Sequence, residues 1–476
     1  MSKFMKLIPI IVIVAMVLSA CAQATQAPIA ATQIPATQAP ATQVPPTQVP
    51  PTEVSATATE VPATEAPKIE LTYWDNMDSS TVPFQDGLIK EFEAAHPNIT
   101  INHQNYSLND MQVKLPTALS SGVGPDLVEA DVSPQWLGTY VKSNQILPLD
   151  DAYTQYGWDK RVFQWAQDRV TYDGKRYAVG HEFETLGLMY NKKIFTELGI
   201  QVPQTLEELE AAMDKIKQDG KYTPMMLASG SASPWNTIHM FNAIAYGIVP
   251  MDVVNATTPL GNGSYLDPSW KAALEKFQSW IDKGYYPENA STYDWDTQNS
   301  LFCAGKVAML TQGTWNFGSL TQCATENNLD WGFAPFPVPE GKPFQAYIGI
   351  GSGFYAPAYI SKDPTREKAV LDFLDFIISP ENATLWVTEA KIFPAVPFDK
   401  SAANLSEQQL SALAIVDKAG ATGGGPIPIC FNNSNDELEI WKSGLEGMVL
   451  KQTNIDTFLQ QLNTQLKADQ AAWAAK

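Results

Sequence analysis

The sequence predicts an α/β protein whose folded part, residues 68–476, holds two separate sheets flanked by helices. Strand-like and helix-like segments alternate between residues 69 and 131, and the alternation restarts after residue 200. The end of the chain, residues 406–474, is helical in pattern throughout. A β-α-β-α-β order predicts parallel strands with helices on both faces. The folded part is also too long for one ordinary core, so we expect two or three domains.

Each element follows from hydrophobic spacing and from the residues that start and stop helices. In the first run we expect strands at 69–74, 99–106 and 125–131, separated by helices at 82–97 and 109–122. In the second run we expect strands at 223–229 and 306–311 and helices at 203–217, 233–247, 268–284 and 315–327. A glycine-rich strand at 345–357 precedes helices at 363–379, 380–391, 406–419, 435–450 and 453–474. Thr205 with Glu208 three residues later forms a capping box, and Pro116 kinks the helix that ends at Gly122.

The amino terminus reads as a secretory signal peptide over residues 1–20. Lys3 and Lys6 precede a short apolar stretch that is too short for a comfortable membrane-spanning helix. The end of that stretch, Leu18-Ser19-Ala20-Cys21, resembles the bacterial lipobox, which implies cleavage before Cys21 and lipidation of that residue. The alternative is an ordinary signal peptide with a chance cysteine.

Residues 22–67 predict a disordered tether. They contain no aromatic residue, no Gly, no Lys and no Arg, and they repeat ATQAP-like pentapeptides rich in Ala, Thr, Gln and Pro. Such a segment buries too little apolar surface to offset its ordering entropy. Frequent proline favours extended geometry, so the tether holds the folded part at a distance from a membrane anchor.

Composition narrows the classes of partner and of chemistry. The formal net charge of −20 argues against nucleic acid, which needs clustered Lys and Arg. The 13 Trp and 17 Tyr raise the expectation of flat apolar ligands such as sugars. The sequence leaves open whether Cys303 and Cys323 form a disulfide, with Cys430 as a buried thiol. The absence of a C-x-x-C pair gives no support to a zinc ribbon or a redox site.

Four stretches resemble, in order, the signature regions of extracellular solute-binding proteins of bacterial ABC transporters, in the cluster that binds sugars and oligosaccharides. They are GLMYNKKIFTELGIQVPQTLEELEAAMDKIK, LFCAGKVAMLTQGTW, WGFAPFPVP and REKAVLDFLDFIISPENATLW. The resemblance implies a two-lobed periplasmic-binding-protein-like (type II) fold, each lobe a mixed sheet flanked by helices, with a helical C-terminal tail. It implies an N-terminal lobe of residues 68–181 plus 346–391 and a C-terminal lobe of residues 184–343 plus 394–476. The crossings would lie near Glu182–Phe183, Phe344–Tyr347 and Ile392–Phe393.

The resemblance also implies a function and its partners. Ligand is captured in the cleft between the lobes, the lobes close by a hinge motion, and the closed form meets the membrane permease. We expect no cofactor, no metal and no enzymatic activity, and a monomer tied by its lipid anchor to the outer face of the cell membrane.

Ligands of doubly wound lobes lie at the carboxyl ends of strands, and that rule selects candidate residues here. Strand ends supply Trp74, Asn76, Asp78, Tyr106, Glu129 and Asp131. Matching to the family adds Glu184, Trp235, Trp315 and Gly351, with Phe431 or Trp441 as a further aromatic from the tail. A structural role is also open for three of these residues, because Trp74 and Trp315 suit a hydrophobic core and Asp78 suits a helix N-cap.

These residue types suit a neutral polyol. Indole rings cover the apolar faces of a pyranose, and carboxylates accept hydrogen bonds from its hydroxyls. The same carboxylates also suit a polyamine, so a binding protein for polyamine, peptide or metal is one rival interpretation. A surface adhesin and a secreted carbohydrate-active enzyme are the others. A glycosidase needs only two carboxylates, whereas the motifs of other enzyme classes are absent from the sequence.

Overall fold

The computed structural model describes residues 67–476, except 231–233, 260, 402, 423–433 and 475–476. The predicted signal peptide, Cys21 and residues 22–66 of the predicted tether lie outside the described residues, as do Cys430 and Phe431. The chain divides into two units, Met1–Thr64 and Glu65–Lys476, and the description below concerns the second.

The first run of predicted elements forms a parallel sheet. Strand β1 (Ile69–Asp75) lies between β2 (Ile99–Asn105) and β3 (Leu127–Asp131) and is parallel to both. The intervening helices are α1 (Val82–Ala95) and α2 (Leu108–Ser121). Gly122 ends α2 in the left-handed conformation that the sequence predicts for a terminal glycine. The α/β prediction is therefore confirmed in this region.

Two antiparallel strands extend this sheet. The strand order is β2-β1-β3-β10-β6-β8-β7, and two short strands also pair with β6. Strand β10 (Ile348–Tyr355) pairs with both β3 and β6, so a strand late in the chain returns to the middle of the early sheet. The family resemblance predicted such a mixed sheet.

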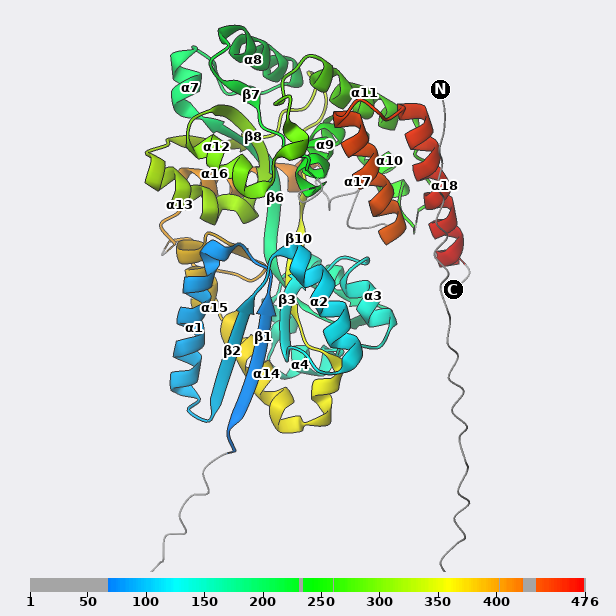
Figure 1. The fold of residues 1–476 in the computed structure, drawn as a ribbon. Coiled ribbons are helices and arrows are strands. Elements are labelled where there is room, and N and C mark those ends of the chain that lie inside the picture. Colours follow the sequence, from blue (N-terminus) through cyan, green and yellow to red (C-terminus); the bar gives the residue numbers. More distant parts are fainter. Residues whose placement is uncertain (1–66, 231–233, 260, 402, 423–433, 475–476) are drawn as a thin grey trace, which may run out of the picture. The chain divides into compact units, whose positions relative to one another are not determined.

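Strand β6 (Val179–Asn191) belongs to both groups of strands. Its first half pairs with β10 and with β11 (Phe393–Pro394). Its second half pairs with β8 (Val307–Gly313) and β9 (Trp331–Pro335) from Leu186 onward. Figure 1 shows β6 running from the elements around β1–β3 to the elements around β7 and β8.

The second group of strands is covered by long helices. Strand β7 (Thr223–Met225) is parallel to β8 and is shorter than the predicted strand. Helix α8 (Leu206–Asp219) begins at Thr205, whose side chain accepts a hydrogen bond from the Glu208 amide as predicted. Helix α9 (Pro234–Ile248) packs on β6 and β8, α11 (Pro268–Asp282) and α17 (Asn435–Val449) pack on α9, and α18 (Ile455–Ala474) packs on α17 and α11. The predicted helical tail is confirmed by α16 (Glu407–Thr422), α17 and α18.

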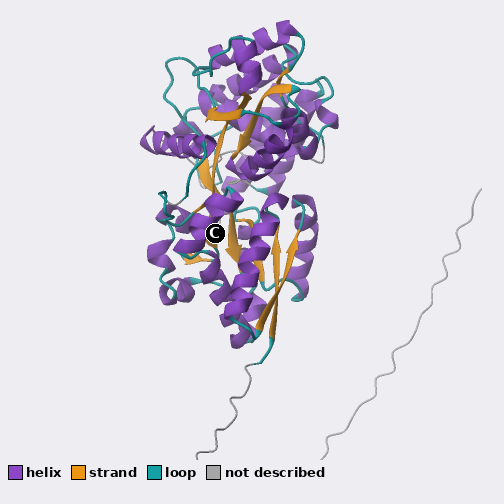
Figure 2. Cartoon of the chain, turned by 90° about the vertical axis from the view of Figure 1, so that its left-hand side faces the viewer, coloured by secondary structure: helices purple, strands orange, loops and turns teal. Residues whose placement is uncertain are grey.

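Apolar side chains fill the space between helices and strands. Figure 2 shows helices on both sides of the strands. One cluster packs α1 and α14 (Pro364–Ile377) against the early strands through Phe92, Phe354 and Phe373. A second cluster packs α9, α11 and α17 together through Phe241, Phe277 and Trp441. Within the described residues, no helix combines the length and the apolarity that a membrane span needs.

The long strand β6 was not predicted as a strand, since only a crossing near Glu182–Phe183 was expected, and β9, β11 and α12 (Trp295–Cys303) were not predicted either. Further short elements were also not predicted. They are η1 (Ser79–Thr81), α3 (Leu137–Lys142), α4 (Asp150–Gln155), α5 (Trp158–Arg161), α6 (Gln164–Arg169), β4 (Thr171–Tyr172), β5 (Lys175–Arg176), α7 (Lys192–Glu197), α10 (Met251–Ala256), η2 (Ala290–Thr292), η3 (Thr314–Asn316) and η4 (Ala358–Lys362). The predicted helix over 380–391 is divided into α15 (Pro380–Leu385) and η5 (Trp386–Ala390). These short pieces carry weak periodicity, so tertiary packing rather than local pattern determines them.

A disulfide joins two helices of the second group. Cys303 ends α12 (Trp295–Cys303) and Cys323 lies in α13 (Phe317–Asn327). Their Cα atoms lie 5.9 Å apart, and the two cysteines are 20 residues apart in the sequence. The bridge connects two helices that each contribute residues to the pocket described below.

Candidate functional site

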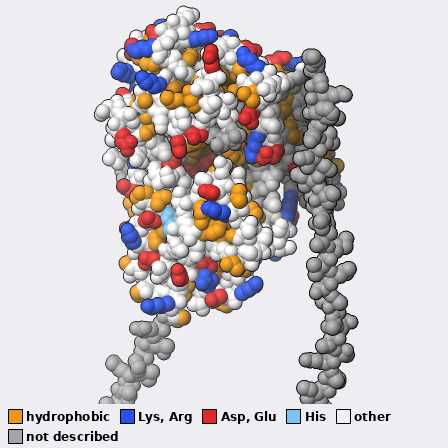
Figure 3. Space-filling model, viewed as in Figure 1, with side chains coloured by type: hydrophobic (Ala, Val, Ile, Leu, Met, Phe, Trp, Pro, Cys, Tyr) orange, Lys and Arg blue, Asp and Glu red, His pale blue; other side chains and the backbone are white. Residues whose placement is uncertain are grey.

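A pocket of ≈ 640 Å³ lies where the two groups of elements meet along β6 and β10. Its volume is within the usual range for small-molecule sites. Figure 3 shows a recess on this side of the folded unit with acidic side chains beside it. Its lining comes from both groups: Asn76, Met77, Asp78, Ser79, Asn105, Tyr106, Ser107, Leu108, Asn109, Glu129, Asp131, Trp136, Glu182, Glu184, Trp235, Asn236, His239, Asp294, Trp295, Asp296, Trp315, Ser319, Gly351 and Ser352.

Nine of the ten residues predicted to contact ligand line this pocket. They are Asn76, Asp78, Tyr106, Glu129, Asp131, Glu184, Trp235, Trp315 and Gly351. Trp74 is the exception, because successive side chains of a strand alternate between its two faces. Its ring packs edge-on against Tyr106, with 5.0 Å between the ring centroids. Trp441 lies fully buried between Phe241 and Phe458 and also lies outside the pocket.

A buried histidine and aspartate support the first pocket loop. Asp75 ends β1 and accepts hydrogen bonds from the Met77 amide (2.9 Å) and from Asn105 Nδ2 (2.6 Å). The His103 ring lies between Asp75 (2.5 Å) and Asp86 (2.8 Å). Burial opposes the charged imidazolium, but the hydrogen bond to Asp75 and both carboxylates raise the pKa of His103 above its ordinary value.

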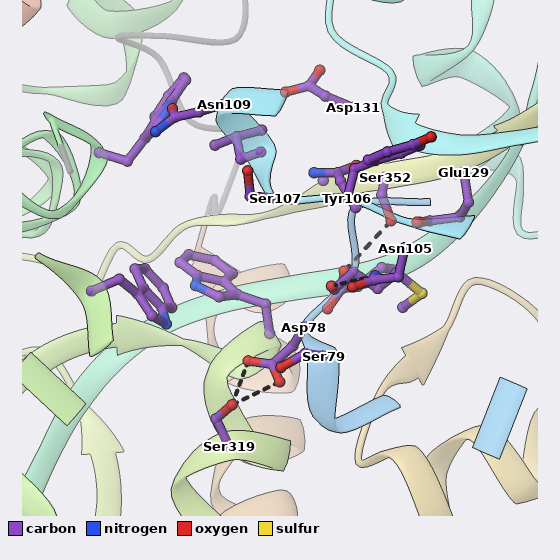
Figure 4. Close-up of a pocket in the computed structure, with 18 of the residues that line it drawn as sticks. Asp78, Ser79, Asn105, Tyr106, Ser107, Asn109, Glu129, Asp131, Ser319 and Ser352 are labelled. Atoms are coloured by element: carbon purple, nitrogen blue, oxygen red, sulfur yellow. Dashed lines mark hydrogen bonds between the residues drawn. The ribbon is translucent and has the colours of Figure 1, made fainter. Parts of the chain in front are cut away.

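Asp78 connects the two groups of elements. Its carboxylate caps η1 by accepting from the Ser80 amide at 2.9 Å, so the N-cap role considered for it is real. The Ser319 hydroxyl of α13 lies 2.7 Å from Oδ1 and 2.6 Å from Oδ2 of Asp78. Figure 4 shows these two side chains facing each other at one edge of the pocket. Asp78 therefore holds a helix of the second group beside a turn of the first.

Four carboxyl groups line the floor of the pocket, two on β3 and two on β6. Burial raises the pKa of Glu129 well above its ordinary value, and nearby Asp75 adds to the effect. Burial and the neighbouring Glu129 raise the pKa of Glu182 to about 8. Burial and the neighbouring Glu182 also raise the pKa of Glu184 well above its ordinary value. Burial raises the pKa of Asp131 to about 6, against the opposing effect of hydrogen bonds from Ser133.

Gly351 leaves room for one of these carboxyl groups. A Cβ atom at this position would lie 1.8 Å from Glu184 Oε1 and 2.3 Å from Oε2. The pairing of β10 with β6 shifts register between Ile350 and Ser352, so Gly351 is the extra residue of a β-bulge. The hydroxyl of Tyr347 donates to Glu184 Oε2 at 2.9 Å and fixes the position of the carboxyl group above the glycine.

Aromatic rings form a wall opposite the carboxyl groups. The His239 ring lies between Trp235 and Trp315, with centroid distances of 6.1 Å and 4.8 Å. Burial lowers the pKa of His239 to about 3, so the ring is neutral at physiological pH. Gly313 permits this arrangement, because a Cβ atom there would lie 2.0 Å from the Trp315 ring. Trp295, at the start of α12, adds another indole to the lining.

Sequence reasoning missed several residues of this lining. Glu182 had a signal, since it lies two positions before Glu184 on one strand and therefore shares its face. His239, Asp294 and Ser319 had none, because only the tertiary structure brings α9, α12 and α13 to the pocket. None of the described residues that line the pocket is Lys or Arg. Among the described residues, no cluster of His, Cys, Asp and Glu has an arrangement suited to a metal ion.

Comparison with protein families identifies residues 87–414 as matching the model for bacterial extracellular solute-binding protein. The maltotriose-binding protein of Pyrococcus abyssi is 26% identical over 305 residues, which cover 62% of this chain and 60% of that protein. The match therefore spans about three fifths of the length of that relative. The maltodextrin-binding protein MdxE of Bacillus subtilis is 23% identical over 389 residues, or 80% of this chain and 83% of that protein.

Solved structures show the same fold at lower identity. A chitin oligosaccharide binding protein superposes with a TM-score of 0.76 at 19% identity, covering 85% of this chain and 99% of that chain. The maltose/maltodextrin-binding domain MalE from Bdellovibrio bacteriovorus, bound to maltotriose, superposes with a TM-score of 0.65 at 20% identity. That match covers 84% of this chain and 99% of that one. The predicted fold class is thus confirmed as that of the maltose-binding proteins.

Proposed function

Because the chain belongs to the bacterial extracellular solute-binding protein family, we propose that it is the substrate-binding component of an ABC importer for a sugar or oligosaccharide. The observation that carries this proposal is the composition of the pocket. Trp235, Trp295 and Trp315 from the second group of elements line it together with carboxyl and amide groups from both groups. The maltotriose- and maltodextrin-binding relatives support the sugar class.

The geometry suits the two-sided chemistry of a pyranose. Its apolar C–H faces pack on flat indole rings, and its hydroxyl groups exchange hydrogen bonds with a polar surface. Burial raises the pKa values of Glu129, Glu182 and Glu184 so far that these groups carry protons near neutral pH, and they can then both donate and accept. Asn76 and Asn105 add amide donors from the ends of β1 and β2. We assign these residues to ligand binding and propose no catalytic step for them.

Capture would follow from closure of two lobes. We propose that the lobes consist of residues 68–181 plus 346–391 and 184–343 plus 394–476, with β6 as one of the crossings. The contact between Asp78 and Ser319 supports this proposal, because it joins residues from the two proposed lobes at the pocket edge. A ligand favours the closed state only through its greater affinity for that state.

The first residues of the chain would place the protein at a membrane. We propose cleavage before Cys21, lipidation of that cysteine and a disordered tether over residues 22–67, which leave the folded part outside the cytoplasm. The permease subunits of the importer are the proposed protein partners. Acyl chains supply roughly 0.8 kcal/mol per buried methylene, so more than one chain is needed for stable anchoring.

A thermal-shift panel followed by calorimetry tests the function. We expect a rise in melting temperature with at least one mono- or oligosaccharide, since a ligand that binds the native state stabilises it. The variant Leu410→Ser is the control, and it should show the same sugar-induced shift as the wild type because Leu410 is exposed and lies outside the lining of the pocket. A broad sugar panel without any shift in the wild type would contradict the sugar class.

A further inference from the structure

Four carboxyl groups occupy one face of three adjacent strands. Glu129 and Asp131 are two residues apart on β3, and Glu182 and Glu184 are two residues apart on β6, so each pair shares a face. Strand β10 lies between β3 and β6, and its Ser352 is paired with Asp131 on one side and Glu182 on the other. Neighbouring strands lie about 4.8 Å apart, so the two pairs face each other across about 10 Å.

The middle strand leaves the space between them open. Beside Glu184, β10 carries Gly349 and Gly351, neither of which has a side chain. The Glu184 carboxyl group occupies the place where a side chain at Gly351 would begin. The Ser352 hydroxyl lies at 3.5 Å from Glu182 Oε2, which is a weak contact. Between the four carboxyl groups, β10 therefore contributes only the two glycines and the small side chain of Ser352.

Several oxygens of this group lack a full hydrogen bond with any of the described residues. Glu129 is 0% exposed, and its only hydrogen-bonding neighbour among the described residues is the Ser352 hydroxyl, which lies too far or too poorly aligned for a full hydrogen bond. Glu182 is 6% exposed, and its Oε1 is without a partner. A buried polar atom without a partner costs free energy, so its persistence points to a partner that the ligand supplies. Both residues line the pocket, so a bound molecule has access to them.

The surroundings supply little positive charge. His181 Nδ1 lies 3.9 Å from Glu129 Oε1, and burial lowers the pKa of His181 to about 3, so its ring is neutral. Arg169 on α6 lies near enough to lower the pKa values of Asp131 and Glu184, but it does not line the pocket. Other titratable groups near the four carboxyl groups are Asp75, Asp78 and Tyr347, together with the buried phenols Tyr73, Tyr140, Tyr172 and Tyr355.

We propose that the pocket selects a saccharide that carries a free amino group, and that its ammonium lies beside the Glu184 carboxyl group, between the carboxyl groups of β3 and β6. This inference rests on the proposed function, since it specifies the sugar class. An ammonium group has three donors and no acceptor, which complements an array of carboxyl oxygens. Each contact with a carboxylate is charge-assisted and hence stronger than a contact between neutral groups.

Binding of the ammonium is coupled to loss of protons from the carboxyl groups. The three glutamates carry protons in the empty pocket because burial disfavours their charge, and an ammonium restores the charged form. Binding of an amine therefore releases protons to the buffer, whereas binding of a neutral sugar leaves them in place. Polyamines share this amine chemistry, but the wall of Trp235, His239 and Trp315 favours a ring over a flexible chain.

Isothermal titration calorimetry with isosteric pairs tests the proposal. The probes are glucosamine against glucose and the glucosamine trisaccharide against cellotriose, with spermidine as a third arm. At pH 6.5 we expect the aminated sugar of a pair to bind at least about tenfold more tightly than its neutral partner. We also expect its measured enthalpy to differ between two buffers of different ionisation enthalpy, which reports proton release by the wild-type protein.

Two matched variants locate the effect. Glu182→Gln removes one carboxyl group of the floor and should reduce the preference for the aminated sugar by about tenfold. Glu288→Gln makes the same substitution at an exposed residue outside the pocket lining and should leave the preference unchanged. The proton-release measurement needs no variant, so a poorly folded Glu182→Gln protein does not block the test.

The outcomes separate the inference from the proposed function. Equal affinity for aminated and neutral sugars, without proton release, overturns the inference and leaves the sugar importer intact. Binding of spermidine with no response to any sugar overturns both the aminated-saccharide inference and the sugar class. A flat titration with every probe also contradicts both.

Discussion

Substitution of Gly351 by alanine should displace a pocket carboxyl group without replacing any group that contacts ligand. The added Cβ atom would lie 1.8 Å from Glu184 Oε1 and 2.1 Å from its carboxyl carbon. Restoring van der Waals separation requires the carboxyl group to move by at least about 1.5 Å. That movement breaks its 2.9 Å hydrogen bond from Tyr347.

The energetic effect has two parts. An extra methyl group in a packed interior costs about 1–3 kcal/mol, and the upper part of that range includes the lost hydrogen bond of about 1 kcal/mol. We therefore expect a melting temperature a few degrees below that of the wild type. Because Glu184 leaves its place in the pocket floor, we expect ligand affinity to fall by about tenfold or more.

Gly180→Ala provides the matched control. Gly180 lies on β6, and its added Cβ atom would meet Ala166 at 3.2 Å and Ile350 at 3.5 Å, neither of which lines the pocket. Thermal unfolding and calorimetry with a sugar that binds the wild type compare the two variants. Gly180→Ala should lower the melting temperature but not the affinity. If Gly351→Ala kept wild-type affinity, Glu184 would have no part in ligand binding.

Three further predictions concern the wall, the edge and the floor of the pocket. Trp315→Ala should weaken sugar binding about three- to tenfold in calorimetry while circular dichroism stays native, because only ring stacking is lost; unchanged affinity would remove Trp315 from the site. Ser319→Ala removes the hydroxyl that bonds Asp78, a contact worth about 1 kcal/mol, and should weaken binding about fivefold; an unaltered dissociation constant would show that this contact is irrelevant to capture. The folded-state pKa of Glu182 is raised to about 8, so the native state binds more protons than the unfolded state and stability falls as pH rises from about 4.5 to 8. Melting curves of the unliganded protein should show a smaller fall for Glu182→Gln than for the wild type; equal falls would contradict this assignment.

Local sequence signals predicted much of the architecture. The hydrophobic spacing of α1 and the strand pattern of β1 and β2 depend on near neighbours, and the structure confirms them. Thr205 and Gly122 mark helix ends through hydrogen bonds and dihedral angles that involve only a few adjacent residues. The parallel order of β1, β2 and β3 followed from the connecting helices.

The pocket was predictable where strand ends determine it. Asn76, Tyr106 and Asp131 follow or end parallel strands, and the topology alone brings such residues together. The prediction for Trp74 failed because side chains alternate along β1, and the sequence does not say which face of the strand turns toward the pocket.

The opposite side of the pocket depends on contacts between distant segments. The Asp78–Ser319 hydrogen bond joins residues 241 positions apart in the sequence. The contact between the rings of His239 on α9 and Trp315 on η3 joins residues about 80 positions apart. No local pattern distinguishes Ser319 from the many other serines of the chain. His239 is likewise a single histidine in a helix, and no spacing in the sequence reports a binding role for it.

Strand β6 places Glu182 and Glu184 immediately before Leu186, the residue at which the strand changes partners from β10 to β8. A ligand that contacts these two side chains acts directly on the segment that connects the two groups of strands. In the proposed closure, the stiffness of this segment and the occupancy of the pocket would therefore depend on the same few residues of backbone.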